Sequence, residues 1–439
     1  MKKVKKVLGV LLAVLMLTSA TAGCSQNGGT TSSDQPSSQS GESQGEASEG
    51  STDEEFEISI SHWMLSDANF NPGSAYMEKV DELFKEAYPN GKIVWNELSG
   101  EKYHELLKAQ LAAKTAPDIF GHNGGTVIPF SEAGYIVDLT GKGWDDRMRE
   151  SCMADCAVDG TIYAIPLDVG GWGINYSKEA FEKCNIKTPP KDWAEFLDMC
   201  ETLKTNGITP INVGLQDEWP ASGIVIAFAS LIYGQNENMK SDLWDGKASF
   251  NGPEFKAVFD AIQELYDKGY IDPGIMSTTY AQATDQLYAG KIGMMFNPTI
   301  LADGDIGFFD IPDAQGKAYI TTGTNSMLSI NSECENQEAA LAALEAMTKP
   351  ETLKLFLKDS FAGLNDVETE QTSVCGQEYA AALDRDISMP QINMWFPSSS
   401  QDIMAQMVSQ IFSGAGYTED DLNAIQTAYE KDKDLVIIH

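Results

Sequence analysis

Short runs with strand periodicity alternate with longer runs of helical periodicity from Phe56 onward. Phe56, Ile58 and Ile60 alternate with polar residues, which is typical of a half-buried strand. Between residues 74 and 88 the apolar residues fall at helical spacing, and a Pro-Asn-Gly turn ends the run. This alternation predicts an α/β fold with largely parallel strand pairing. It continues through a strand at 92–98, a helix at 103–114 and a short buried strand at 118–120.

The rest of the chain is predicted to be richer in helices. Thr321 to Asn325 is expected to form a polar loop ahead of a strand at 327–330, and 291–297 and 306–312 are expected to be extended. Residues 56–439 are too many for one typical core, so two lobes are predicted. The expected helices are 192–205, 221–233, 252–268, 336–348, 351–358, 401–412 and 418–431.

The first residues have the character of a processing segment. Four lysines precede an apolar run from Val7 to Leu17, and small residues lead to Cys24. This pattern predicts a secretory signal peptide over 1–23. A cysteine directly after Thr21-Ala22-Gly23 resembles the lipobox of bacterial lipoproteins, although Thr21 stands where Leu is usual. We therefore expect Cys24 to be a lipid anchor and 24–55 a flexible acidic linker; the alternative is an ordinary cleaved signal.

Charge and cysteine usage exclude several classes of partner. The formal net charge is −35, which disfavours nucleic acid and anionic lipid. Seven cysteines are present without a Cys-x-x-Cys pair, so a zinc ribbon is not supported. Cys152 and Cys156 are four apart, which places them on one face of a helix. We expect the six cysteines after Cys24 to be buried free thiols and assign no disulfide.

Seven phrases of the sequence form an ordered series. They are Phe84–Asn90, Leu111–Phe120, Phe130–Thr140, Asp159–Leu167, Trp172–Phe181, Pro189–Phe196 and Gly290–Met294. In this order they resemble the family 1 extracellular solute-binding proteins, which capture sugars for ABC importers and have maltose-binding proteins as relatives. The likeness runs from about Ile58 to Trp395, and the ordered series is more specific than any one phrase.

The resemblance implies a two-lobed periplasmic-binding-protein-like fold of type II. Its discontinuous lobes are joined by hinge strands, and the ligand lies in the cleft between them. We expect 56–165 plus 304–345 in lobe 1 and 166–303 plus 346–439 in lobe 2. The implied protein is a lipid-anchored, extracellular monomer at the cell membrane. It would deliver a sugar or oligosaccharide to permease subunits, without a cofactor, a metal or catalysis.

A sugar site needs flat aromatic surfaces beside fixed polar groups, because a sugar offers both C–H faces and hydroxyls. By resemblance, the strand that ends before Trp63 opens into the cleft, although Trp63 could instead be core. Asn123 matches a position that holds a sugar hydroxyl in relatives. Asp118 could contact ligand or hold the turn after Pro117, and His122 could donate to a hydroxyl or be exposed.

Further ligand contacts are implied later in the chain. Asp168 matches an acidic contact of maltose-type relatives, and Trp172 could stack on the ligand. The Trp of Glu218-Trp219 resembles an aromatic platform, as does Trp395. Asn297 stands where many relatives carry a ligand-contacting side chain. Trp193 lies on a helix face with apolar neighbours and is expected in the core.

Two other functions remain open. A secreted carbohydrate-active enzyme would need a pair of carboxylates across the scissile bond, which the many acidic residues do not exclude. However, neither a Gly-x-Ser-x-Gly nor a His-Glu-x-x-His motif occurs within 56–439; Gly41–Gly45 has the first spacing but lies in the expected linker. A binder of polyamine or another cation would suit the acidic residues. The four histidines, His62, His104, His122 and His439, make a poor metal site, and few cationic residues near the expected site disfavour anions.

Overall fold

The computed structural model describes residues 54–65, 74–96, 100–298, 300–301, 303–357 and 359–435. All of them belong to one compact unit, 53–439. The expected signal peptide and Cys24 lie outside the described residues, as does the expected linker up to residue 53.

The larger sheet has the strand order β12-β6-β11-β3-β1-β2, and β13 pairs with β11. β1 runs parallel to β2 and β3, as the alternation of strand and helix predicts. β11 runs antiparallel to β3 and β6, so the sheet is mixed. The strands are β1 (Phe56–Ser61), β2 (Gly91–Asn96), β3 (Ile119–His122), β6 (Ile165–Gly170), β11 (Tyr319–Ile330), β12 (Phe361–Ala362) and β13 (Ile387–Pro390).

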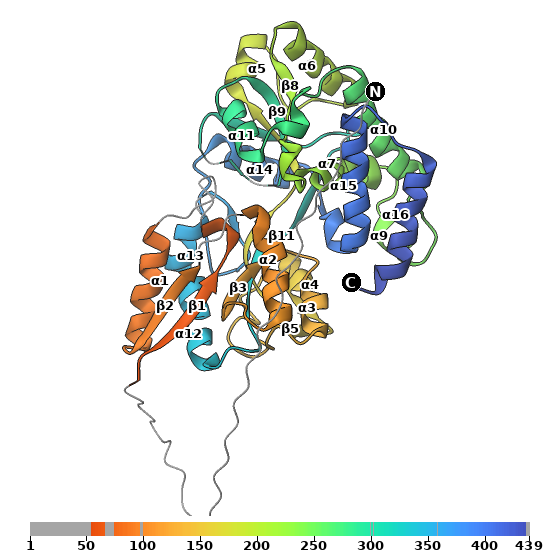
Figure 1. The fold of residues 1–439 in the computed structure, drawn as a ribbon. Coiled ribbons are helices and arrows are strands. Elements are labelled where there is room, and N and C mark those ends of the chain that lie inside the picture. Colours follow the sequence, from red (N-terminus) through yellow and green to blue (C-terminus); the bar gives the residue numbers. More distant parts are fainter. Residues whose placement is uncertain are drawn as a thin grey trace, which may run out of the picture. The chain divides into compact units, whose positions relative to one another are not determined.

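Helices α1, α12 and α13 pack against one another beside β1 and β2 (Figure 1). Tyr76, Val80 and Phe84 of α1 are buried, which is the face that the helical spacing predicts. The elements beside this sheet are η1 (Trp63–Leu65), α1 (Ser74–Ala87), α2 (Gly100–Ala113), α3 (Val127–Glu132), α4 (Glu150–Cys156), β4 (Ala157–Val158), β5 (Thr161–Ile162), α12 (Gln337–Thr348) and α13 (Pro350–Leu357).

A second sheet has the order β10-β7-β9-β8. Its central strands β7 (Gly173–Ser177) and β9 (Ile292–Asn297) are buried along their whole length. The outer strands are β8 (Thr209–Ile211) and β10 (Ile306–Phe309).

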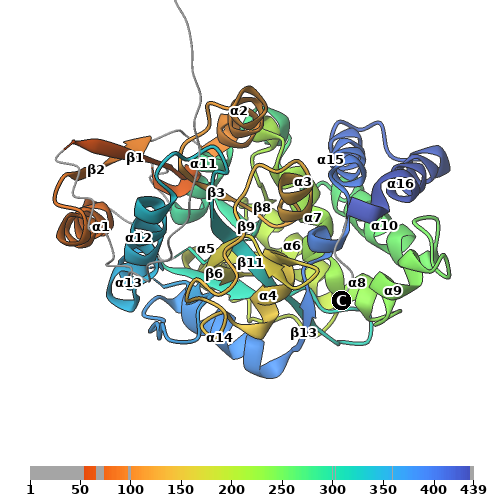
Figure 2. The same cartoon turned by 90° about the horizontal axis from the view of Figure 1, so that it is seen from below.

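Most of the remaining helices belong with the second sheet, and α15 lies against α7, α10 and α16 (Figure 2). The helix expected over 221–233 is two helices, because Phe228 leaves the helical conformation. The helices are α5 (Lys178–Cys184), α6 (Trp193–Thr205), η2 (Leu215–Asp217), α7 (Pro220–Ala227), α8 (Ala229–Tyr233), α9 (Met239–Trp244), α10 (Pro253–Asp267), η3 (Ile275–Ser277), α11 (Tyr280–Tyr288), α14 (Val374–Arg385), η4 (Ile392–Trp395), α15 (Ser398–Phe412), α16 (Glu419–Asp432) and η5 (Lys433–Leu435).

Each sheet has its own apolar core. The first core takes buried residues from 58–167 and 327–367, and the second takes them from 172–311 and 392–429, with Tyr319. Two segments therefore differ from the expected lobe ranges. Helix α13, expected in lobe 2, packs against α1 in the first core. Strand β10, expected in lobe 1, pairs with β7 of the second sheet.

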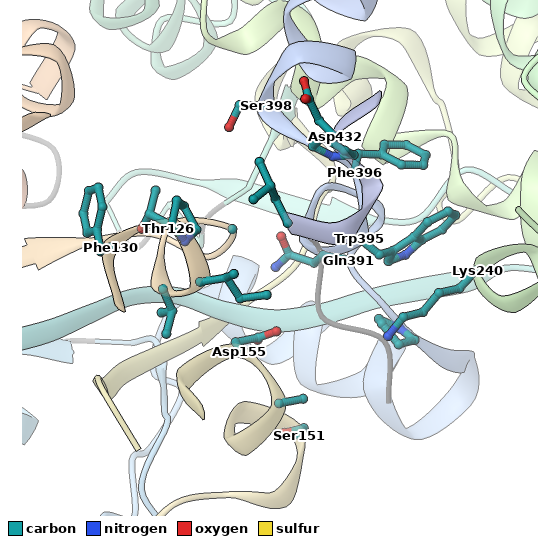
Figure 3. Close-up of a pocket in the computed structure, with 18 of the residues that line it drawn as sticks. Thr126, Phe130, Ser151, Asp155, Lys240, Gln391, Trp395, Phe396, Ser398 and Asp432 are labelled. Atoms are coloured by element: carbon teal, nitrogen blue, oxygen red, sulfur yellow. The ribbon is translucent and has the colours of Figure 1, made fainter. Parts of the chain in front are cut away.

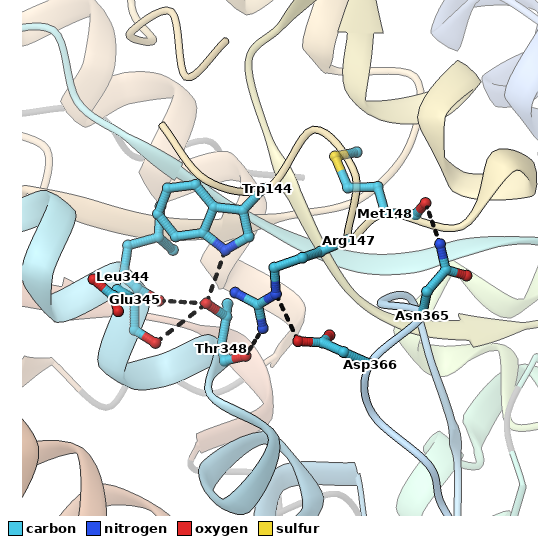
Figure 4. A network of polar contacts seen from close by, with 8 residues as sticks. All are labelled: Trp144, Arg147, Met148, Leu344, Glu345, Thr348, Asn365 and Asp366. Carbon is cyan, nitrogen blue, oxygen red and sulfur yellow. Dashed lines mark hydrogen bonds and ion pairs between the residues drawn. The ribbon is translucent and has the colours of Figure 1, made fainter. Parts of the chain in front are cut away.

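A polar network explains why the segment after α12 stays with the first core (Figure 4). Arg147 donates from Nη2 to the carbonyl of Thr348 at 2.7 Å and from Nε to Asp366 at 2.8 Å. The indole of Trp144 donates to Thr348 Oγ1 at 3.0 Å, and Asn365 donates to the carbonyl of Met148 at 2.8 Å. These contacts hold 348–366 against the loop before α4.

The predicted polar loop at 321–325 is wrong, because β11 continues through it. The backbone there pairs with β13 and β6, and Thr321 and Thr324 are buried. The hydroxyl of Thr321 accepts from the amide of Trp172, and the amide of Thr324 donates to Asp155. Buried polar groups are tolerated when they have such partners.

Among the described residues, no helix combines the length and apolar character needed to cross a membrane. The cysteines after Cys24 are buried and free, as predicted. Cys152 and Cys156 both lie on α4.

Candidate ligand-binding groove

A groove lies between the two cores. It consists of two adjoining cavities, a smaller one of about 690 Å³ and a larger one of about 1050 Å³. The first core lines it from α2, α3, α4 and the loop after β3, and the second core from α7, η4 and α15. Figure 3 shows Thr126 and Phe130 on one side of the smaller cavity and Trp395 and Phe396 on the other. Lining residues shared by both cavities are Lys108, Gly125, Thr126, Phe130 and Ser398.

The end of β3 brings His122 and Asn123 to the larger cavity. His122 is fully buried, and its two ring nitrogens bond to the hydroxyls of Thr126 at 2.8 Å and Ser329 at 2.7 Å. Burial lowers the pKa of His122 to about 3, so the ring is neutral. Asn123 is exposed and can reach a ligand, whereas His122 holds the loop that presents it.

Trp219 is the exposed aromatic of the larger cavity, with 38% of its surface accessible. Its ring lies 4.9 Å from that of Tyr280 and 6.1 Å from that of Trp172. Glu218, beside it on the cavity wall, has a φ of 60°, which is strained for a residue with a Cβ. Such strain often occurs where a loop must present a side chain to a ligand.

Trp172 and Trp395 are both buried but differ in their relation to the groove. A Cβ on Gly223 of α7 would lie 1.6 Å from the Trp172 ring, so this ring packs directly on the backbone of α7. Trp172 thus supports the loop that carries Trp219 and does not line either cavity. Trp395 is 1% exposed and lines the smaller cavity, packed against Phe396 and Tyr233.

Asp168 lies outside both cavities and organises β11. Its carboxylate accepts hydrogen bonds from the amide and hydroxyl of Ser326, at 2.9 and 2.5 Å, and from the side chain of Asn325 at 3.0 Å. The register of β11 against β6 shifts on either side of Ser326. Burial raises the pKa of Asp168, and the hydrogen bonds from Ser326 and Asn325 partly offset this by lowering it.

Three further expected residues also make contacts within the protein. Asp118 accepts from the amide and hydroxyl of Ser59, at 2.8 and 2.6 Å. Asn297 is buried between Tyr280 and Asn175. Trp63 stacks on His62 at 4.1 Å. The expected residues that line the groove are therefore His122, Asn123, Glu218, Trp219 and Trp395.

Sequence reasoning missed a pair of opposite charges in the smaller cavity. Lys240 of α9 and Asp155 of α4 both line it, one from each core (Figure 3). Burial lowers the pKa of Lys240, and the negative charge of Asp155 partly offsets this by raising it. No local pattern marks these residues, because the two are far apart in the sequence.

The match to known proteins agrees with this architecture. A family model described as bacterial extracellular solute-binding protein matches residues 67–354. The chain belongs to this family of extracellular solute-binding proteins.

Individual relatives are distant. A Rhizobium meliloti (strain 1021) protein named "Probable sugar-binding periplasmic protein" is 23% identical over 73% of this chain and 79% of its own length. An "Uncharacterized ABC transporter extracellular-binding protein" of Pyrococcus horikoshii is 27% identical over 54% of this chain and 57% of its own length. The solved structure titled "Chitin oligosaccharide binding protein" matches with a TM-score of 0.77 at 21% identity, over 86% of this chain and 99% of that one. The expected two-lobed α/β fold is confirmed.

The buried neutral His122 predicts a specific pH dependence of stability. Its pKa is about 3 in the folded protein and about 6.5 when unfolded. The stability that the neutral His122 ring contributes is therefore fully present above pH 6.5 and is lost as the pH falls from 6.5 towards 3. Between pH 8 and pH 5 the free energy of unfolding should fall by about 2 kcal/mol less in His122→Gln than in the wild type. Urea denaturation measures this, and equal losses in both proteins would contradict the assignment.

Proposed function

We propose that the protein is the extracellular solute-capturing subunit of an ABC importer, and that the solute is a sugar or oligosaccharide. The observation that carries the proposal is the pairing, across one groove, of the exposed ring of Trp219 with the exposed amide of Asn123. An aromatic face suits the C–H side of a sugar, and an amide can both donate to and accept from hydroxyls. The name of the Rhizobium meliloti relative, which refers to sugar binding, supports the same solute class, and that of the Pyrococcus horikoshii relative supports ABC transport.

Capture would occur by closure of the two lobes on the solute. The open form offers the groove, and a solute that contacts both walls favours the closed form. The closed form then docks on the membrane permease. The proposal assigns no catalytic step to this chain, since ATP hydrolysis would belong to another subunit.

A cationic solute, such as a polyamine, is the second candidate. The observation in its favour is that carboxylates outnumber lysines among the residues that line the groove. The lysines are Lys108 and Lys240. The carboxylates are Glu150, Asp155, Glu218, Asp402 and Asp432. Polyamines therefore belong in the same binding screen as sugars.

We also propose that the mature protein is a monomer anchored to the outer face of the cell membrane through lipid on Cys24. The basic start, the short apolar run and the small residues before Cys24 support this. In Cys24→Ala the protein should leave the membrane fraction for the medium. Continued membrane association of this variant would contradict the anchor.

A thermal-shift screen tests the solute class, and Trp219→Ala tests the site. A solute that binds the folded state adds about 2.7 kcal/mol of stability at 100 times its Kd. We expect a sugar to raise the Tm of the wild type. Trp219→Ala should weaken its binding by about 1–2 kcal/mol, or roughly tenfold in Kd, because apolar contact with the ring is lost. The Tm without solute should change little, because this ring is partly exposed.

The matched control is Trp95→Ala, which removes a half-buried tryptophan on β2 that does not line the groove. The affinity of Trp95→Ala for the sugar should equal that of the wild type. Unchanged affinity in Trp219→Ala would contradict the site, and a Tm rise with polyamines alone would replace the sugar by a cation.

A further inference from the structure

The exposed face of α15 forms a regular polar row along the larger cavity. Asp402, Gln406 and Gln410 are exposed and line this cavity. They are four residues apart, so they lie on one face of the helix with a spacing of about 6 Å. The opposite face, including Met407 and Ile411, is buried in the second core.

The side chains of this row are free to bind a solute. Within the described part of the chain, the side chains of Asp402, Gln406 and Gln410 donate and accept no hydrogen bond. Two neighbouring serines behave differently, since Ser409 donates to the carbonyl of Ala405 and Ser413 to that of Gln410. The helix therefore presents two unengaged amides and one unengaged carboxylate to the cavity.

The same cavity carries exposed apolar surface. Trp219 and Met276 are 38% and 41% exposed, and both line it. Helix α7, which follows Trp219, packs along α15, and η3, which contains Met276, also contacts it. Asn123 and Lys108 face the row from the first core. A polar row beside exposed apolar side chains suits a chain of sugar rings, which repeats hydroxyls and C–H faces along its length.

The length of the cavity wall formed by α15 indicates the size of the solute. Eight residues between Ser398 and Ser413 line the cavity over about 22 Å of α15 and the turn after it, which corresponds to about four pyranose units end to end. The row from Asp402 to Gln410 occupies the middle of this wall, over about 12 Å. A volume of about 1050 Å³ is far more than one hexose needs. Two amides and one carboxylate recognise hydroxyls, and the row itself gives an anionic chain no positive partner; Lys108, from the first core, is the one lysine among the lining residues of this cavity.

We infer that Asp402, Gln406 and Gln410 of α15 bind successive units of a linear, neutral oligosaccharide, so that affinity rises with chain length up to about four units. This inference rests on the proposed function, because it assumes that the groove binds sugar. It adds that the solute is an oligomer and that the contacts along one face of α15 determine the chain length that binds best.

Calorimetric titration of the purified protein with a neutral linear oligosaccharide series of two to six units tests the inference. The series is built from the sugar that raises the Tm in the screen. In the wild type, Kd should fall at least tenfold from two to four units and then stay level. Equal affinity for all lengths would overturn the inference but leave the proposed function intact. If no sugar of any length binds and an oligopeptide does, both fail.

Variants at the two ends of the row locate the effect. Asp402→Ala and Gln410→Ala each remove one polar group, and a disaccharide can occupy only part of the row. At least one of the two variants should weaken tetrasaccharide binding about fivefold while changing disaccharide binding less than twofold. Gln337→Ala is the control, since Gln337 is an exposed glutamine on α12 outside the groove. If both variants match this control at every length, α15 does not bind the chain.

Discussion

The structure depends on the hydrogen bonds that Asp168 accepts from Asn325 and Ser326. These bonds fix β6 to β11 at the place where the register shifts. β11 begins at Tyr319 in the second core and ends at Ile330 in the first, so one strand belongs to both. A buried carboxylate that lost these donors would carry an uncompensated desolvation cost. Asp168 therefore stabilises the crossing between the two lobes.

The same crossing positions the wall of the groove. A Cβ on Gly171 would lie 1.7 Å from the carbonyl oxygen of Thr321, so the chain can pass β11 this closely only with glycine there. Trp172 follows at once and packs on Gly223 of α7 and beside Trp219. The hinge and the aromatic wall are thus joined through one buried ring. A change in the angle between the lobes would move Trp219 relative to Asn123 on the other wall.

The sequence predicts the parts of this molecule that depend on local periodicity. The burial of α1 and the pairing of β1 follow from apolar spacing, and the ordered phrases indicate the family. The polar run at 321–325 was misassigned, because its threonines are buried by partners far away in the sequence, such as Trp172 and Asp155. Asp168 and Asn297 have the residue types of ligand contacts, yet their partners are other protein groups. The row on α15 was missed for a related reason: periodicity identifies its buried face but not what the exposed face lines.

Small-angle X-ray scattering, with and without a saturating solute, tests the central claim most directly, namely that solute binding closes the two lobes about the β6–β11 crossing. The account predicts a smaller radius of gyration in the presence of the solute. If the two lobes are first locked in the closed position, adding the solute should leave the radius of gyration unchanged. An unchanged radius of gyration at full occupancy would contradict the account, because the groove would then bind its solute without lobe closure.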